Sequence, residues 1–230
     1  MKTIARLADD LLWLLFPTLC AACSRPLFTG EECICTFCRY KLPRTHFHLQ
    51  NENPVVQHFW GKIPIGVATS YFHFTKGEKV QRLIHQLKYK GRQDVGVFIG
   101  KTMGIELKPW LQQSDLIIPV PLHESRLKKR GYNQSECFAD GLSTGSGIPM
   151  NITSLIRGKA TETQTSRHRY ERYLNMEDVF TIREPGLIYN KNILLVDDVI
   201  TTGSTLIACA EKLIESGCGR INIAAIAAAR

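Results

Sequence analysis

Two adjacent acids followed by a loop of small residues form the segment with the clearest chemical potential. Asp197 and Asp198 follow four apolar residues, 193–196, which are typical of a buried parallel strand. The next loop is rich in hydroxyl groups and comprises Thr201, Thr202, Gly203, Ser204 and Thr205. Backbone amides of such a loop, at the start of the helix expected after it, can bind a phosphate. Because the acids would repel a phosphate, we assign them to sugar hydroxyl groups, from which carboxylates accept hydrogen bonds.

This segment resembles the phosphoribosyl pyrophosphate (PRPP) motif of type I phosphoribosyltransferases. The resemblance implies that Asp197 and Asp198 are the catalytic acids facing the ribose 2′ and 3′ hydroxyls, and that 201–205 hold the 5′-phosphate. The alternative is a strand, turn and helix in which the acids only cap the helix. A Walker A loop is excluded because the segment lacks Gly-Lys-Ser/Thr.

Four cysteines near the N-terminus have the spacing of a metal site. Cys20-x-x-Cys23 and Cys35-x-x-Cys38 each present two thiolates, and two such pairs suit tetrahedral zinc. Cys33 could replace Cys35 as a ligand. Unliganded or disulfide-linked cysteines are the alternative, and iron instead of zinc also stays open. We therefore predict a small zinc ribbon.

Composition limits the possible partners. The chain has 230 residues and a net charge of +8, which favours anionic ligands such as phosphorylated metabolites or nucleic acid. A basic but merely solvated surface is equally compatible. No apolar run approaches the ~20 residues of a membrane span. Asp9 and Asp10 precede the apolar stretch 11–16 and would spoil a signal peptide, so we expect a cytoplasmic protein.

Alternating strand and helix patterns must position these groups. They predict an open, mostly parallel α/β sheet over residues 61–230, which is the type I phosphoribosyltransferase fold that the resemblance implies. The expected strands are 68–74, 115–121, 152–156, 193–196 and 221–227, and residues 178–182 are expected to return as a ribbon. Residues 1–45 are expected to form a helix and the zinc ribbon, and residues 46–60 a connector.

A basic segment follows the expected strand 115–121, and we predict a loop that faces an anion. Residues 119–134 read Pro-Val-Pro-Leu-His-x-x-Arg-Leu-x-x-Arg-Gly-Tyr-Asn-Gln, which resembles the signature of the ComF/GntX family, competence-associated bacterial proteins with a phosphoribosyltransferase domain. The order of motifs along the chain is also that family's. The resemblance implies pyrophosphate binding by His123, Arg126 and Arg130. Lys88, in a basic cluster after an expected helix, is a further candidate; a solvated helix end is equally plausible there.

Residues 157–173 are polar, basic and short of aliphatic side chains, so we predict a mobile lid. They resemble the flexible catalytic loop of the family, and the resemblance singles out Gln164, Thr165, Arg167 and Arg172. Arginines interleaved with Tyr170 and Tyr173 could equally clamp single-stranded nucleic acid. A solvated loop is the third possibility.

Three functions follow from these features. The first is a ComF-type protein that binds PRPP with Mg²⁺, or another phosphoribosylated small molecule, and assists natural transformation, handling single-stranded DNA with other competence proteins. The second is an active phosphoribosyltransferase on an unidentified base or amine; Thr201, where purine-salvage enzymes usually carry an acid, argues against hypoxanthine or guanine. The third is an accessory protein that senses PRPP or is linked to iron–sulfur maturation, as GntX-type relatives are.

Overall fold

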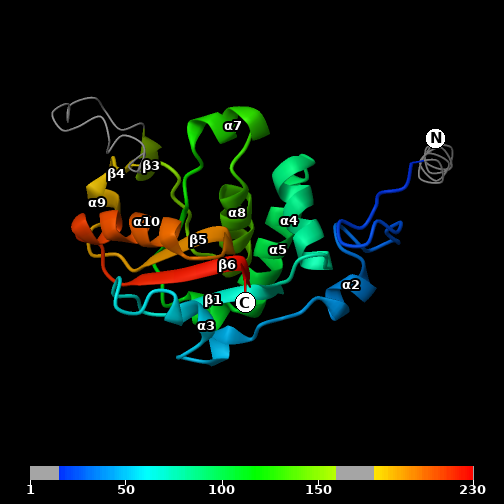
Figure 1. Cartoon of the computed structure of the whole chain (residues 1–230), viewed down its shortest axis with the longest axis horizontal. Helices are drawn as coiled ribbons and strands as arrows, with labels where there is room; N and C mark the ends of the chain where they lie inside the picture. The colour runs from blue at the N-terminus through cyan, green and yellow to red at the C-terminus, as the bar shows by residue number, and fades with distance from the viewer. Residues whose placement is uncertain (1–15, 159–178, 230) are drawn as a thin grey trace, which may run out of the picture.

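A four-stranded parallel sheet forms the centre of the molecule. The computed structural model describes residues 16–158 and 179–229. In spatial order the strands are β1 (Ala68–Phe74), β6 (Ile221–Ala229), β5 (Ile193–Ile200) and β2 (Leu116–Pro119). All three neighbouring pairs are parallel, and helices flank the sheet (Figure 1). The predicted α/β fold class is confirmed.

The apolar pattern of each element explains its place in the fold. Residues 193–196 of β5 are buried on both faces, as the continuous apolar run predicts. One face of the sheet packs against α4 (Lys79–Tyr89), α5 (Gln93–Glu106) and α8 (Gln134–Ser146). The opposite face packs against α3 (Pro54–Gln57) and α10 (Ser204–Glu215). The remaining short helices are α2 (Thr36–Lys41), η1 (Phe47–Leu49), α6 (Lys108–Leu111), α7 (Glu124–Arg130) and α9 (Pro185–Ile188).

Helices α5 and α8 touch through their backbones along a row of glycines. A Cβ added at Gly100 would lie 2.2 Å from the carbonyl oxygen of Phe138, and one at Gly141 would lie 2.1 Å from that of Val97. Gly96, Gly104 and Gly145 extend the same row, each with atoms of the other helix within 3.0 Å of an added Cβ. The two helices therefore pack at a distance that only glycine permits.

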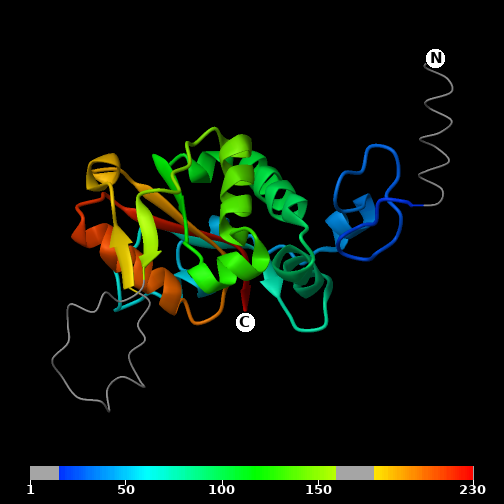
Figure 2. The ribbon, with the colours of Figure 1, turned by 90° about the horizontal axis from the view of Figure 1, so that it is seen from above.

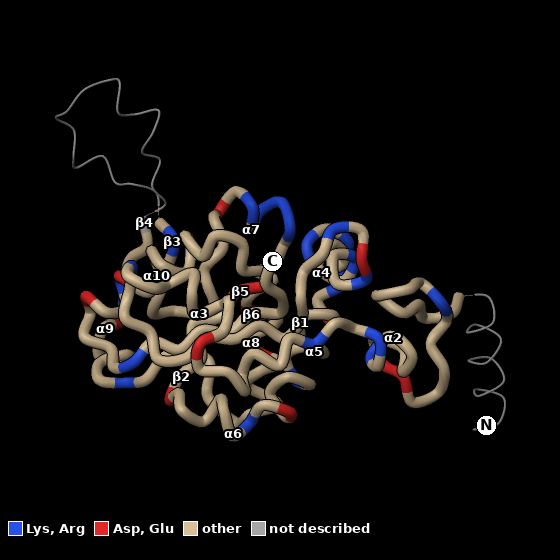
Figure 3. The backbone as a smooth tube through the Cα atoms, turned by 60° about the horizontal axis from the view of Figure 1, so that its bottom comes forward, with Lys and Arg blue, Asp and Glu red and all other residues tan. Residues whose placement is uncertain are grey.

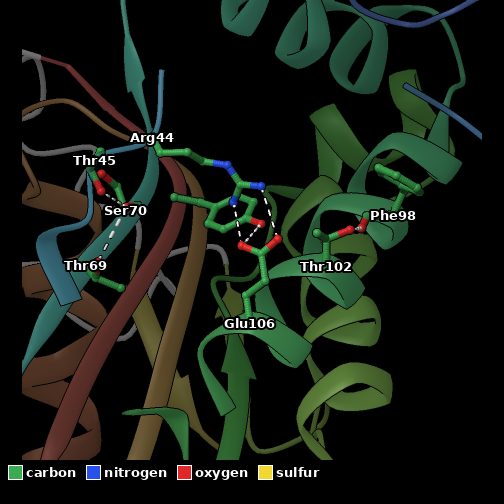
Figure 4. A network of polar contacts seen from close by, with 8 residues as sticks. Arg44, Thr45, Thr69, Ser70, Phe98, Thr102 and Glu106 are labelled. Atoms are coloured by element: carbon green, nitrogen blue, oxygen red, sulfur yellow. Dashed lines mark hydrogen bonds and ion pairs between the residues drawn. The ribbon is translucent and has the colours of Figure 1, made fainter. Parts of the chain in front are cut away.

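The segment that leads from the cysteine region covers the free edge of β1. Arg44 forms an antiparallel bridge with Phe72, and its guanidinium donates to both carboxylate oxygens of Glu106 at 3.0 and 3.3 Å. The same guanidinium lies 3.7 Å from the ring centroid of Tyr71, whose hydroxyl donates to Glu106 at 2.6 Å. Figure 4 shows this network joining the segment to both β1 and α5.

Residues 46–60, expected as a connector, hold η1 and α3 and pack onto the sheet. Asn53 is buried; its side-chain oxygen caps α3, and its amide donates to the carbonyl of Ala68 in β1. Phe59 is fully buried in the apolar core on this face.

Two local expectations are wrong. Residues 152–156 do not form a strand of the parallel sheet: β3 (Leu155–Gly158) pairs antiparallel with β4 (Val179–Ile182) in a separate ribbon. The expected return of residues 178–182 as a ribbon is thereby confirmed. The anion-facing segment 122–134 is not a loop throughout, because α7 occupies its centre. The expected N-terminal helix and most of the expected lid lie outside the described residues.

Candidate functional site

The loop after β5 encloses a small hollow at the start of α10. Residues 201–205 line it together with the end of β5, and the hollow measures about 30 Å³. Gly203 caps the helix with φ 76°, a left-handed conformation that favours glycine. An added Cβ there would also lie 3.2 Å from the ring of Phe59. The five residues predicted to hold a phosphate thus surround one helix N-terminus, the positive end of the helix dipole.

The sequence pattern placed the two acids after the end of the strand. They lie within β5 instead, because β5 stays paired with β6 as far as Ile200. The two carboxyl groups contact residues of two helices, α8 and α4, that pack on the same face of the sheet. Asp198 is buried, and one of its carboxylate oxygens lies 2.9 Å from Nζ of Lys88 in α4. Asp197 accepts hydrogen bonds of 2.8 Å from the hydroxyl of Ser135 and from the backbone N–H of Asp198.

The environment of Asp197 favours its protonated form. Burial raises the pKa of Asp197 to about 7, and the negative charge of Asp198 acts in the same direction. The hydrogen bond from Ser135 and the charge of Lys88 oppose the shift without cancelling it. A ligand that brings hydrogen-bond donors or a cation would favour the ionised carboxylate.

A cavity of about 320 Å³ brings the acids and the predicted cations together at the carboxyl ends of β2 and β5. Its lining includes Lys88, Arg126, Arg130 and both acids, together with Thr201 and Thr205 of the phosphate loop. This is the edge at which open α/β sheets bind ligands. Cations from α4 and α7 therefore face the acids of β5 across one cavity.

His123, the remaining predicted pyrophosphate contact, does not line this cavity. Its ring caps α7: Nδ1 accepts a hydrogen bond from the backbone N–H of Ser125 at 3.2 Å and lies 2.7 Å from that residue's hydroxyl. The four predicted lid residues, Gln164, Thr165, Arg167 and Arg172, lie outside the described residues.

Among the cavity residues that were not predicted as site residues, Ser135 and Arg157 carry groups that can bind the acids or an anion. Ser135 is buried in the first turn of α8, where Asn133 caps its backbone N–H, and it binds Asp197 across 62 residues of sequence. Arg157 lies in β3, and its guanidinium is 5.4 Å from the ring of Phe180. The sequence holds one signal for each residue. Ser135 stands in an Asn-x-Ser sequence that is typical of a helix start, and Arg157 is the first residue of the basic segment 157–173.

The four predicted metal ligands form a compact cluster. Ligand atoms of Cys20, Cys23, Cys35 and Cys38 all lie within 4.8 Å of one another, which suits one tetrahedral ion. Three of these residues are buried, and Cys23 is half-buried. Cys33 is outside the cluster, so the structure selects Cys35 between the two candidates. Burial and the nearby Asp94 raise the pKa of the Cys33 thiol to about 12.

Fold and site together define a phosphoribosyltransferase-type domain that carries a four-cysteine module. The family model "Phosphoribosyl transferase domain" matches residues 116–230. The chain therefore contains a domain of this family.

Three curated relatives identify the family more closely. The chain is 29% identical to "DNA utilization protein YhgH" of Escherichia coli O157:H7, over 90% of this chain and 95% of the relative. It is 30% identical to "Competence protein F" of Haemophilus influenzae, over 72% and 69% of the two chains. It is 28% identical to "Competence protein ComFC" of Bacillus subtilis, over 63% and 57%. The chain therefore belongs to the ComF family. Separately, no helix in the described parts of the chain has the length and apolar character needed to span a membrane.

Proposed function

We propose that the cavity binds PRPP and that the protein assists DNA uptake in natural transformation by handling single-stranded DNA. The proposal that the cavity binds PRPP rests on three features that lie together at one edge of the sheet. These are a hydroxyl-rich phosphate loop at a helix N-terminus, a pair of acids, and three cations opposite the acids.

Each feature suits one part of PRPP. Residues 201–205 offer backbone N–H and hydroxyl donors to the 5′-phosphate. Asp197 and Asp198 accept hydrogen bonds from the ribose hydroxyls, and Lys88, Arg126 and Arg130 neutralise the pyrophosphate. Mg²⁺, a hard cation that prefers oxygen ligands, would be held by the carboxylates and would offset the pyrophosphate charge. The lid residues named above remain candidates for closing over this ligand.

The DNA-handling part is supported by the printed names of the relatives and by the basic surface. The relatives are called DNA utilization and competence proteins. Lys and Arg positions gather on α7 and around the end of α4, beside the cavity (Figure 3). Binding of single strands should weaken steeply as salt rises, because each phosphate contact releases counterions. Other competence proteins are the expected partners, in the cytoplasm.

A catalytic phosphoribosyltransferase is the second candidate function. It is favoured by the presence of both acids and of cations opposite them, which could stabilise departing pyrophosphate. For the four-cysteine cluster we propose zinc as the resident ion, since four thiolates suit it. Iron in anaerobically purified protein would instead favour an accessory role in iron–sulfur chemistry.

Calorimetric titration with PRPP and Mg²⁺ tests the proposal. Wild type should show saturable binding, and Asp198→Asn should bind at least about tenfold more weakly, because a charge-assisted hydrogen bond is lost. Asp140→Asn, which removes an exposed acid from α8, is the matched control and should bind as wild type does. Equal binding by wild type and a folded Asp198→Asn variant would contradict the assignment of the acids.

A further inference from the structure

A second cavity adjoins the first and is lined by cations without any acid. It measures about 490 Å³ and lies between the C-terminal end of α4 and α7. We call it the basic cleft; its lining residues are Lys88, Tyr89, Gly91, Arg126, Lys129, Arg130 and Tyr132. Figures 1 and 2 show α4 and α7 side by side above the sheet edge that carries the candidate site. Four cations on its walls make this cleft a site for a polyanion.

The aromatic residues of the basic cleft differ in their freedom to contact a ligand. Tyr132 is fixed, because its hydroxyl donates to the carbonyl of Leu87. Tyr89 is 60% exposed, and the guanidinium of Arg130 lies 5.2 Å from its ring centroid. An exposed ring beside phosphate-binding cations matches the stacking platforms on which single-stranded nucleic acids bind. In a duplex the bases are stacked on each other and present only their edges, so no base face reaches this ring.

The basic cleft shares part of its lining with the PRPP cavity. Lys88, Arg126 and Arg130 line both cavities, whereas Lys129 and Tyr89 line only the basic cleft. The three shared cations are those assigned to pyrophosphate. Two polyanions cannot both be neutralised by the same three side chains, so occupancy of one cavity must weaken occupancy of the other.

We propose that the basic cleft takes a nucleotide of single-stranded DNA, with a base on Tyr89 and phosphates on Arg126 and Lys129, and that the strand competes with the pyrophosphate of PRPP. This inference rests on the proposed function and adds to it the location of the strand and a regulatory link. PRPP would then displace the strand, and a bound strand would weaken PRPP binding by the same factor.

Fluorescence anisotropy of a labelled oligothymidylate tests where the strand binds. Lys129→Gln should weaken binding and reduce the slope of log affinity against log salt by about 1. Lys128→Gln is the matched control: Lys128 is the neighbouring cation on α7, is 76% exposed, pairs with Glu124 and does not line the basic cleft. Tyr89→Ala should weaken binding by at least ~5-fold while Tyr89→Phe retains it, since only the alanine variant removes the ring.

Competition tests the link between the cavities. Adding PRPP with Mg²⁺, or inorganic pyrophosphate alone, should release the oligonucleotide, and Lys129→Gln should leave PRPP affinity unchanged. Simultaneous binding of strand and pyrophosphate would overturn the link. Equal effects of the Lys128 and Lys129 substitutions, or a preference for duplex DNA, would overturn the location.

The same experiments distinguish failure of the proposed PRPP site from failure of the basic cleft. If PRPP does not bind but pyrophosphate still releases the strand and the Lys129 effect holds, the proposed function fails at its ligand, and the basic cleft stands.

Discussion

Asp197 and Asp198 are neighbours in sequence, yet each contacts a different helix. Asp197 is bound by Ser135 of α8, and Asp198 is paired with Lys88 of α4. Both contacts lie in one cavity, so the two carboxyl groups can bind two different atoms of one ligand. Burial and the charge of Asp198, in contrast, make the ionised form of Asp197 less favourable.

The protonation of Asp197 should be visible in the stability of the protein. Its pKa is about 7 when folded, against an ordinary value of 3.8. Between these values the folded state keeps a proton that the unfolded state has released, so the free energy of unfolding falls as pH rises from about 4 to about 7. Asp197→Asn removes this cost and should be more stable than wild type at pH 8, by on the order of 1–3 kcal/mol.

Urea denaturation at several pH values measures this difference, which should shrink towards pH 4. Asp140→Asn, on the exposed face of α8, should follow the wild-type curve at every pH. A constant offset between Asp197→Asn and wild type across the range would show that the carboxyl group does not titrate as described.

Among the elements, the α5–α8 pair has the least tolerance for added volume. Gly100→Ala would place a methyl group 2.2 Å from a main-chain oxygen, which cannot move without shifting a helix. We expect a loss of about 2 kcal/mol or more in the free energy of unfolding. Gly186→Ala is the control, because an added Cβ there meets no atom within 4 Å. Denaturant unfolding of both variants checks the prediction; equal stability would mean that the helices separate without cost.

The accuracy of the sequence predictions varied from element to element for physical reasons. The strands 68–74 and 193–196 and the helix that runs into the basic cluster at Lys88 were predictable because of the pattern of their apolar residues. Helix α7 was missed because none of its residues is buried, so it has no apolar stripe. It is held instead by the His123 cap and the Glu124–Lys128 pair.

The sequence predictions failed where the structure or role of a residue depends on contacts with segments that are distant in the sequence. The segment 152–156, Ile-Thr-Ser-Leu-Ile, is compatible with a parallel strand and with one arm of a ribbon, and only its pairing with β4 decides between them. The acids and the phosphate loop were identifiable because their spacing is local. Ser135 was not, because its role depends on a contact that only the folded sheet creates.

At the scale of the whole molecule, the four-cysteine module shares its apolar core with the sheet domain. One continuous cluster joins Leu27 and Ile34 of the module to Leu87 of α4, Val95 of α5 and Leu194 of β5. The module lies at the opposite end of the molecule from the β3–β4 ribbon (Figure 2). Loss of the metal should therefore destabilise more than the module alone.

Metal removal tests this coupling. A strong chelator should lower the melting temperature of the whole chain, by more than about 5 °C, in a single transition. Cys35→Ala should lose the metal, whereas Cys33→Ala should keep one ion per chain, because only Cys35 belongs to the cluster. Calorimetry with metal analysis gives both readouts. Two separated transitions would mean that the module unfolds independently, and metal loss in Cys33→Ala would contradict the ligand set.

The glycine row between α5 and α8 has a consequence for the history of the family. A contact between two backbones cannot be restored by compensating side-chain changes. A substitution of one of these glycines therefore cannot be offset by a second substitution elsewhere. The relatives named above retain only 28–30% identity with this chain. We expect Gly100, Gly141 and Gly145 to be among the positions that they share, while exposed positions of the same helices diverge freely.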